Sequence, residues 1–298
     1  MKDFSGKVAF ITGGASGIGL GMARAFVRNG MKVVIADVRE DHLQESALAL
    51  GTAGNTHFIR LDVCDRAAML RAADETERVF GKVHVLCNNA GVGMFGELKR
   101  ATYSDWDWGI GINLGGVING IQTFLPRILA HGEGGHIVNT SSIGAVVPMP
   151  GGIIYIAAKC AVFGMTEALR SELDADNIGV TLLCPGPTST NIHEVARLRP
   201  ERFQDTGFGA VEAELAKRTT PDVWMDPGTV GERVFEAMRR NTLFVMTHNE
   251  FKAGAQARFK AILAGFPPGE PDPQRVRALG FPVANAMYEQ ILQSEGSD

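Results

Sequence analysis

Short runs of β-branched and apolar residues alternate along the chain with longer segments whose apolar positions recur at helical spacing. The strand-like runs cover residues 7–12, 32–37, 56–62, 82–89, 135–142, 179–185 and 242–247. Helical spacing is clearest in residues 19–30, 65–81 and 226–241. Strands that alternate with helices favour right-handed β-α-β units, which build a parallel sheet covered on both faces. The pattern therefore predicts an α/β fold with one doubly wound parallel sheet of about seven strands and helices on both faces.

Residues 187–225 interrupt this alternation. They contain few β-branched runs, and we interpret them as a helical excursion that forms a lid over the sheet. Residues 250–266 then predict an amphipathic helix, which a Pro-rich link and a weak helix follow. We expect a main domain over residues 1–250 and a C-terminal helical extension over residues 251–298, which could close a pocket or cover a subunit interface.

Composition and charge narrow the classes of partner. The 298 residues are 45% hydrophobic and carry a net charge of −4. Because no block of Lys and Arg stands out, we expect neither nucleic acid nor a membrane as partner. The N-terminus has no secretion signal and no apolar stretch reaches 18 residues, so we expect a cytoplasmic protein. The four cysteines match neither zinc nor redox spacing, and no metal site is expected.

The glycine-rich stretch "TGGASGIG" (12–19) follows the first predicted strand and opens the first helix. A dinucleotide pyrophosphate needs backbone N–H groups at a helix N-terminus with no Cβ in the way, and Gly13, Gly17 and Gly19 meet that need. Ser16 and Ile18 lie in the same turn and are further candidate cofactor contacts. A plain connector is the alternative, but the position between strand and helix favours cofactor binding.

Asp37 ends the second predicted strand, 18 residues after Gly19. That spacing is close to the ~20 residues expected for the acid that accepts hydrogen bonds from the adenosine ribose. A carboxylate there repels a 2′-phosphate, so NAD is predicted as the cofactor in preference to NADP. Arg39 could reach a phosphate, although the glycine-rich turn offers it no basic partner. The alternative role for Asp37 is to cap the next helix.

The third predicted strand ends on another acidic residue. Asp62 is the candidate to accept a hydrogen bond from the adenine amine, and Val63 follows it as a candidate cofactor contact. A role for Asp62 in a turn remains equally open.

Tyr155 and Lys159, in "YIAAK", are the two polar groups of an otherwise small and apolar run. If the run is helical, positions i and i+4 share one face, so the phenol and the ammonium meet. A phenol has a pKa near ~10, and nearby positive charge would bring it to a range where proton transfer is efficient. A half-buried tyrosine with a lysine that snorkels beside it is the structural alternative.

Six motifs together resemble the short-chain dehydrogenase/reductase family. They are "TGGASGIG", "NNAG" (88–91), "INLGG" (112–116), "NTSS" (139–142), "YIAAK" (155–159) and "PGPTST" (185–190), and they follow the family's order and spacing over roughly residues 5–250. The resemblance implies a single Rossmann-type catalytic domain with a nicotinamide cofactor. It also implies hydride transfer to or from the carbon of a carbonyl or an alcohol.

The resemblance also implies individual roles. Tyr155 corresponds to the general acid/base, Lys159 to its partner, Ser142 to the hydroxyl that holds the substrate oxygen, and Asn113 to the anchor of a water chain. The interval of 13 residues to Tyr155 selects Ser142 over its neighbour. Further implied cofactor contacts are Asn89, Ala90, Gly91, Pro185, Gly186, Thr188 and Thr190. Thr188 departs from the family, which usually has Ile or Val there.

The loops after the fourth and fifth predicted strands and the excursion after Pro187 should frame the substrate, and the two loops make its wall apolar. Their apolar residues are Met94, Phe95, Val146, Val147 and Met149, and "GVGMFGE" and "IGAVVPMPGG" contain no Lys, Arg or His. A lipophilic or aromatic secondary alcohol, or its ketone, fits such a wall best. Pieces such as "DWDWGIGINLGGVING" are similar to a bacterial branch with Cα-dehydrogenases of lignin-derived aryl ethers, which implies a bulky benzylic alcohol. A buried loop base is the alternative for these apolar residues.

Assembly and rival functions follow from the same resemblance. Family members pair through the segments that correspond to residues 104–131 and 152–176, which implies a homodimer or homotetramer. A redox-sensing NAD(H)-binding protein with little turnover, or an epimerase or dehydratase with tightly held NAD, remain as alternatives. The chain retains all four candidate catalytic residues, so we favour an enzyme.

Overall fold

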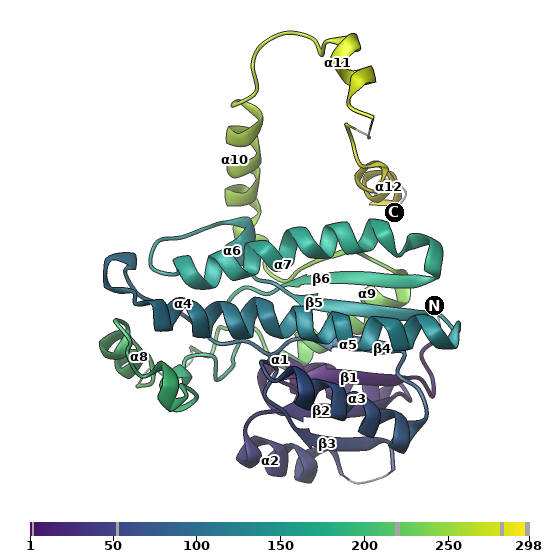
Figure 1. Ribbon diagram of the computed structural model, residues 1–298, viewed down its shortest axis with the longest axis vertical. Coiled ribbons are helices and arrows are strands. Elements are labelled where there is room, and N and C mark those ends of the chain that lie inside the picture. Colours follow the sequence, from purple (N-terminus) through teal and green to yellow (C-terminus); the bar gives the residue numbers. More distant parts are fainter. Residues whose placement is uncertain (2, 52–53, 218–220, 281–282, 296–298) are drawn as a thin grey trace. The chain divides into compact units, whose positions relative to one another are not determined.

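Seven parallel strands form one sheet in the computed structural model of the protein, in the order β3-β2-β1-β4-β5-β6-β7 (Figure 1). The strands are β1 Val8–Thr12, β2 Lys32–Asp37, β3 Thr56–Arg60, β4 Val85–Asn88, β5 Gly135–Thr140, β6 Ile178–Cys184 and β7 Phe244–Met246. The sheet confirms the predicted Rossmann-type α/β fold. The structure describes residues 1, 3–51, 54–217, 221–280 and 283–295, so parts of the predicted lid (218–220) and extension (281–282, 296–298) lie outside the described residues.

Helices cover both faces of this sheet. They are α1 Gly17–Arg28, α2 Glu40–Leu50, α3 Arg66–Phe80, α5 Gly116–His131, α7 Ile153–Glu172 and α9 Pro227–Arg240. The shorter helices α4 Tyr103–Ile110, α6 Ile143–Val146 and α8 Gly209–Leu215 lie in connecting segments, and a π-helical turn, η2 Gly111–Gly115, joins α4 to α5. In Figure 1, α5 and α7 lie in front of the sheet and α9 lies behind it. Because both faces are covered, β6 is buried at every position, which explains its continuous apolar sequence.

Two glycines let α1 and α9 approach each other closely. A Cβ on Gly21 would lie 2.1 Å from the carbonyl oxygen of Pro227, and a Cβ on Gly231 would lie 2.2 Å from the carbonyl oxygen of Gly21. Any larger residue would therefore push the helices apart. Asp226 caps α9 by accepting a hydrogen bond of 2.8 Å from the Thr229 N–H, with Pro227 at the first helical position.

The chain order reverses between β1 and β4, and their carboxyl ends meet there. The Thr12 hydroxyl at the end of β1 accepts hydrogen bonds from the N–H groups of Asn89 (3.0 Å) and Ala90 (3.1 Å). It donates to the carbonyl oxygen of Cys87 at 3.3 Å. These bonds fix the loops that follow both strands. Ligands of open α/β sheets bind at such a reversal, outside the carboxyl ends of the strands.

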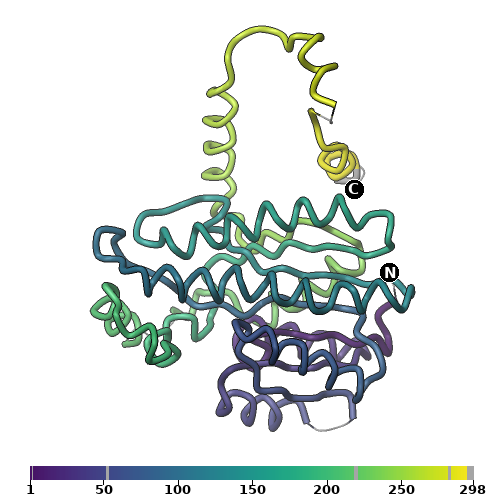
Figure 2. Tube along the Cα trace, viewed as in Figure 1, coloured from purple at the N-terminus to yellow at the C-terminus, as the bar shows by residue number. Residues whose placement is uncertain are grey.

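Residues 187–225 are less helical than predicted. They form the 3₁₀ turns Val195–Arg197 and Glu201–Phe203 and the single short helix α8 within the described part of the segment. Prolines and glycines interrupt longer helices there, since proline lacks the N–H that a helix interior requires. Figure 2 shows the segment that contains α8 beyond the carboxyl ends of the strands, beside α4.

A buried ionic cluster attaches this segment to α4. The Arg199 guanidinium lies 3.0 Å from Asp105 Oδ1, forms an ion pair with Glu212, and lies over the Trp108 ring at 4.4 Å. The Thr206 hydroxyl donates to Asp105 Oδ1 at 2.6 Å. Burial disfavours the Asp105 carboxylate, but hydrogen bonds from Thr102, Thr206 and the backbone at residue 207 outweigh it and lower its pKa. All three ionic side chains are at most 3% exposed.

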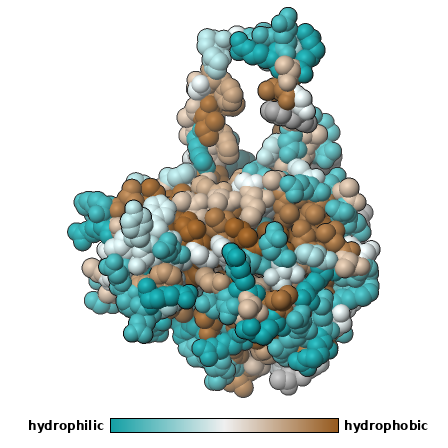
Figure 3. Space-filling model, viewed as in Figure 1, coloured by the Kyte–Doolittle hydropathy of each residue, from teal (hydrophilic) through white to brown (hydrophobic). Residues whose placement is uncertain are grey.

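Apolar side chains gather in a band over α5 and α7 on the face shown in Figure 3. Ile118 and Leu129 of α5 and Ile153 of α7 are about 40% exposed, at 39%, 41% and 42%. These helices are the segments through which subunit pairing is predicted. The assembly itself stays a prediction.

Residues beyond Phe251 form a second unit, Lys252–Asp298. Its helices are α10 Lys252–Leu263, α11 Pro273–Ala278 and α12 Ala286–Glu295. Among the residues that the structure describes, no helix is both long and apolar enough to cross a bilayer.

His136 on β5 makes stability sensitive to acid. Its side chain is 1% exposed, Nε2 lies 2.8 Å from the Thr181 hydroxyl, and burial lowers its pKa to about 3. The unfolded chain therefore binds the proton first, so stability is lost as pH falls from about 6.5 towards 3. We expect this residue to cost about 2 kcal/mol of unfolding free energy at pH 5.

Urea unfolding at pH 7.5 and pH 5 measures this loss of unfolding free energy. In His136→Gln the unfolding free energy should depend less on pH than in the wild type. The matched control is His193→Gln, which changes a partly exposed imidazole. The interpretation is wrong if the wild type and His136→Gln lose equal stability between the two pH values.

Candidate active site

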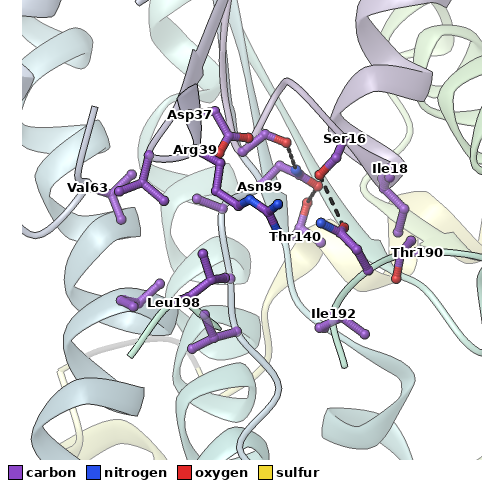
Figure 4. A pocket seen from close by; sticks show the side chains of 18 of the residues that line it. Ser16, Ile18, Asp37, Arg39, Val63, Asn89, Thr140, Thr190, Ile192 and Leu198 are labelled. Carbon is purple, nitrogen blue, oxygen red and sulfur yellow. Dashed lines mark hydrogen bonds between the residues drawn. The ribbon is translucent and has the colours of Figure 1, made fainter. Parts of the chain in front are cut away.

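A cleft opens outside the carboxyl ends of β1, β2 and β4 and holds about 1300 Å³ of space, part of it open to solvent. Figure 4 shows the side chains that line it. Most of the predicted cofactor residues are brought together here: Gly13, Ser16, Gly17, Ile18, Asp37, Asp62, Val63, Asn89, Ala90, Gly91, Tyr155, Lys159, Pro185 and Thr190. Of the other three, Gly19 lies in the first turn of α1, and Gly186 and Thr188 line a neighbouring cleft.

The glycine-rich turn leaves the N-terminus of α1 accessible. Gly13 has φ +60°, and a Cβ there would lie 2.8 Å from the Ala90 Cα. A Cβ on Gly19 would lie 2.0 Å from the carbonyl oxygen of Gly13, so the turn packs too tightly for other residues. Ser16 precedes α1 without capping it, because its hydroxyl donates to Asn191 Oδ1 at 3.1 Å. Uncapped N–H groups at a helix N-terminus fit a pyrophosphate.

Asp37 presents a buried carboxylate to the same cleft. It is 8% exposed and accepts hydrogen bonds from the N–H groups of Ala15 (3.2 Å) and Arg39 (3.1 Å). Burial outweighs these bonds and raises its pKa. A carboxylate has about four lone-pair sites, so Asp37 can accept further donors, and the two hydroxyls of a ribose fit this need.

Asn89 joins three strands at the floor of the cleft (Figure 4). Its Nδ2 donates to the carbonyl oxygens of Thr12 and Gly13, both at 3.2 Å, and its Oδ1 accepts from the Thr140 hydroxyl at 3.4 Å. These bonds connect the ends of β1, β4 and β5. Asn89 thereby holds the glycine-rich turn in register with the strand that precedes the predicted catalytic serine.

Asn113 lies in the π-helical turn η2 and is fully buried. Its side chain accepts from the Val92 N–H at 3.1 Å and donates to the Val92 carbonyl at 3.0 Å. A Cβ on Gly91 would lie 2.7 Å from Asn113 Oδ1 and 3.5 Å from Lys159 Nζ, so these three residues adjoin. Asn113 does not line either cleft, but it lies directly behind the cofactor cleft. Single π-turns inside α-helices are frequent at functional sites.

Tyr155 and Lys159 project from one face of α7, as the spacing predicts. Lys159 Nζ lies 5.7 Å from the centre of the Tyr155 ring and donates to the Thr140 carbonyl at 2.8 Å. Ser142 lies beside Tyr155, and the Gly144 N–H donates to Ser142 Oγ at 3.1 Å. The structure thus places the predicted Ser, Tyr and Lys within one group.

Burial dominates the protonation of this group. It raises the pKa of the Tyr155 phenol, and the hydrogen bond with Ser142 only partly opposes the rise. Burial also lowers the pKa of Lys159 to about 8. The phenol is therefore protonated at neutral pH in the protein alone. Additional positive charge beside the phenol is needed before it can act as a base.

A second cleft meets the first at Tyr155. It is largely apolar and contains Phe95, whose ring centre lies 5.5 Å from that of Tyr155. Ser142 and Met149 also line it. Thr188 lies in its wall and donates to the Gly186 carbonyl at 3.0 Å.

Three predicted substrate residues line neither cleft. Met94 is 1% exposed and packs in a core cluster with Trp108 and Ile154. Val146 and Val147 belong to the end of α6, and Val146 is buried. Phe95 and Met149 of the same loops do line the second cleft, so composition alone could not tell which side chains of each loop face inwards.

The segment after β6 contributes residues that the motifs did not indicate. Asn191, Ile192, Leu198, Pro200 and Arg202 line the cofactor cleft, and Leu215, Pro221 and Trp224 line the second cleft, to which Phe251 after β7 also contributes. In the sequence, the only indication that this segment lines a cleft was a tryptophan and several apolar residues in an otherwise polar stretch. Such a stretch is irregular, so no periodicity assigns these residues to a face.

Comparison with known proteins identifies the class. A sequence model of the family described as "short chain dehydrogenase" matches residues 7–200. C alpha-dehydrogenase from Sphingobium sp. (strain NBRC 103272 / SYK-6) is 41% identical over 286 residues, 94% of each protein. The crystal structure of a short-chain dehydrogenase/reductase from Burkholderia phymatum in complex with NAD is 35% identical, with a TM-score of 0.83 over 91% of this chain and 99% of that one. Apo LigO from Sphingobium sp. strain SYK-6 is 38% identical, with a TM-score of 0.73 over 100% and 99% of the two chains.

The chain belongs to the short-chain dehydrogenase/reductase family. It is therefore an oxidoreductase that uses a nicotinamide cofactor, and the resemblance inferred from six sequence motifs is confirmed. The cofactor cleft, with its uncapped helix N-terminus and buried Asp37, fits such a dinucleotide.

Proposed function

We propose that the protein is an NAD-dependent dehydrogenase that interconverts a bulky secondary aryl alcohol and its ketone, with Tyr155 as acid/base. One observation supports this above the others: Tyr155 lines both the dinucleotide cleft and the apolar cleft. A substrate in the second cleft would therefore lie against both the phenol and the nicotinamide.

In this proposal the chain's own residues move one proton. A nicotinamide held in the cofactor cleft would supply hydride exchange with the substrate carbon and, in its oxidised form, a positive charge beside Tyr155. Ser142 holds the substrate oxygen beside Tyr155, and during oxidation Tyr155 takes the hydroxyl proton. Lys159 Nζ, 5.7 Å from the phenol ring, favours the phenolate while it is charged. The alcohol thus loses two electrons with the hydride and one proton to the tyrosine.

In the proposal, Asn113 extends the group of Ser142, Tyr155 and Lys159 towards the protein interior. It is fully buried beside the main chain at Gly91 and adjoins Lys159. Lys159 Nζ donates to the Thr140 carbonyl. A proton path that starts at Lys159 therefore needs a further polar group beside it, and Asn113 is such a group. We assign Asn113 this positioning role.

Preference for NAD is supported by Asp37. Its carboxylate is 8% exposed and no Lys or Arg forms an ion pair with it among the described residues. A 2′-phosphate would bring a second negative charge to that oxygen, whereas ribose hydroxyls would donate to it. The Burkholderia phymatum relative, determined with NAD, supports the same preference.

The aryl-alcohol class is supported by the second cleft. Phe95, Trp224 and Phe251 supply aromatic surface, and Met149 and Ile156 supply flexible and branched apolar surface. Aromatic walls favour a ring-containing ligand through offset or edge contacts. The relative named C alpha-dehydrogenase, 41% identical, supports the same class. The described residues 187–217 and 221–225 would act as the lid of this site.

A substrate panel with NAD tests the proposal. We expect benzylic secondary alcohols with a bulky side group to give at least ~10-fold higher kcat/KM than linear aliphatic alcohols of similar size, because each contact of the ring with an aromatic side chain contributes about 0.5–1.5 kcal/mol beyond the burial of apolar area. NADH absorbance measures the rate. Trp224→Ala should reduce this preference, and Trp106→Ala, a tryptophan outside both clefts, serves as its control. Equal rates with aliphatic substrates would contradict the aryl-alcohol class.

A further inference from the structure

Arg39 lies inside the cofactor cleft (Figure 4), and its guanidinium already binds two carboxylates. Its Nη1 donates to Glu194 Oε2 at 2.9 Å, and its Nε donates to Asp41 Oδ1 at 3.0 Å. A further bond joins Nη2 to Asp41 Oδ2. The Arg39 side chain is only 16% exposed, so these bonds hold it well away from bulk solvent.

Glu194 reaches this arginine from a distant part of the chain. It belongs to the segment after β6, 155 residues further along, whereas Arg39 and Asp41 lie at the start of α2. Bonding to Arg39 outweighs burial and lowers the pKa of Glu194, which is therefore ionised at neutral pH. Arg197, 69% exposed, lies 3.3 Å from the same carboxylate.

The charge around the predicted ribose site therefore depends on more than Asp37. Asp37, Asp41 and Glu194 contribute three negative charges, and Arg39 and Arg197 contribute two positive ones. His42 lines the same cleft and faces Asp37. An arginine in this position could otherwise bind a 2′-phosphate, because its planar guanidinium can donate two parallel hydrogen bonds to phosphate oxygens. Here three of its five N–H donors are directed at two carboxylates.

We propose that Glu194, together with Asp41, is a specificity-determining residue that occupies Arg39 and so prevents it from binding the 2′-phosphate of NADP. The inference rests on the proposed preference for NAD and extends it to a residue outside the dinucleotide motifs. A phosphate that approached Arg39 would have to displace Glu194 and would leave that carboxylate unpaired in the cleft. Glu194 thus opposes NADP by competing with the phosphate for the arginine.

Binding of NADH and NADPH to the full-length protein tests this, with cofactor fluorescence at neutral pH and low ionic strength as the measurement. In Glu194→Gln we expect the ratio of the NADPH Kd to the NADH Kd to fall by about fivefold, as expected when one charge is removed from a partly screened site. Adding Asp41→Asn should lower the ratio further. Because the effect is electrostatic, high salt should reduce it.

Arg39→Met separates the proposed role from simple repulsion. If Glu194 acts by occupying Arg39, then Glu194→Gln should leave the ratio almost unchanged in a chain that already has Arg39→Met. This double-mutant cycle isolates the coupling between the two residues. A purely structural role for Glu194 would weaken both cofactors equally and leave the ratio constant.

Glu236→Gln is the matched control. That glutamate also pairs with two arginines, Arg239 and Arg240, but on α9 outside the cleft, so the ratio should not change. The inference would be overturned if Glu194→Gln left the ratio of the NADPH Kd to the NADH Kd unchanged. It would also be overturned if Glu194→Gln lowered this ratio equally in the wild type and in Arg39→Met. Tighter wild-type binding of NADPH than NADH would instead overturn the proposed NAD preference. Absence of aryl-alcohol turnover would leave the binding ratios unaffected.

Discussion

Tyr155→Phe is expected to lower kcat by about 10³-fold or more while NAD affinity stays within about twofold. The substitution removes one oxygen, the only group of this side chain that can exchange a proton with the substrate. The ring itself remains, so its contact with Phe95 at 5.5 Å is preserved. NADH absorbance gives the rate, and isothermal titration calorimetry with NAD gives the affinity.

Tyr103→Phe provides the control for this result. Tyr103 is 89% exposed on α4, so removing its hydroxyl should change neither rate nor affinity. If Tyr155→Phe turned over at close to the wild-type rate, Tyr155 would not be the acid/base. Loss of cofactor binding together with turnover would indicate a structural role.

Arg199→Met is expected to destabilise the protein by about 3–5 kcal/mol, or to unfold the segment around it locally. The change leaves Asp105 and Glu212 buried without their counter-charge, and both are at most 3% exposed. It also removes the cation that lies 4.4 Å from the Trp108 ring. Urea unfolding measures the global loss, and hydrogen exchange over residues 195–215 detects local opening.

Neutralising the whole cluster should recover much of this stability. Asp105→Asn and Glu212→Gln combined with Arg199→Met leave no unpaired buried charge, so most of the loss should be reversed. Arg240→Met, which removes an exposed partner of Glu236, should have no measurable effect. A cost for Arg199→Met no larger than that of Arg240→Met would contradict the importance of the buried cluster.

The strands and most of the helices could be predicted because the sequence patterns that define them extend over only a few neighbouring residues. The apolar run 179–185 is continuous because both faces of β6 are covered, and the glycines after β1 meet steric limits within a few residues. The candidate Ser, Tyr and Lys were recognisable because one strand end and one helix face bring them together. The predicted cytoplasmic location and the homodimer or homotetramer stay predictions.

Residues 187–225 could not be predicted in the same way. Their conformation depends on Arg199 meeting Asp105 and Glu212, three positions that no local period connects. The bond between Arg39 and Glu194 likewise joins positions 155 residues apart. For the loops after β4 and β5, the apolar composition was clear, but the packing of Met94 against Trp108 depends on tertiary contacts.

The π-helical turn at Gly111–Gly115 makes the length of this stretch as important as its composition. α4, η2 and α5 form one continuous helix, with Asn113 in the wide turn. Deleting a single residue there would restore regular α-helical winding and remove the wide turn, while α4 and α5 would keep nearly their present directions. The stretch would therefore tolerate many conservative exchanges, but the loss of one position would separate the Asn113 side chain from Val92.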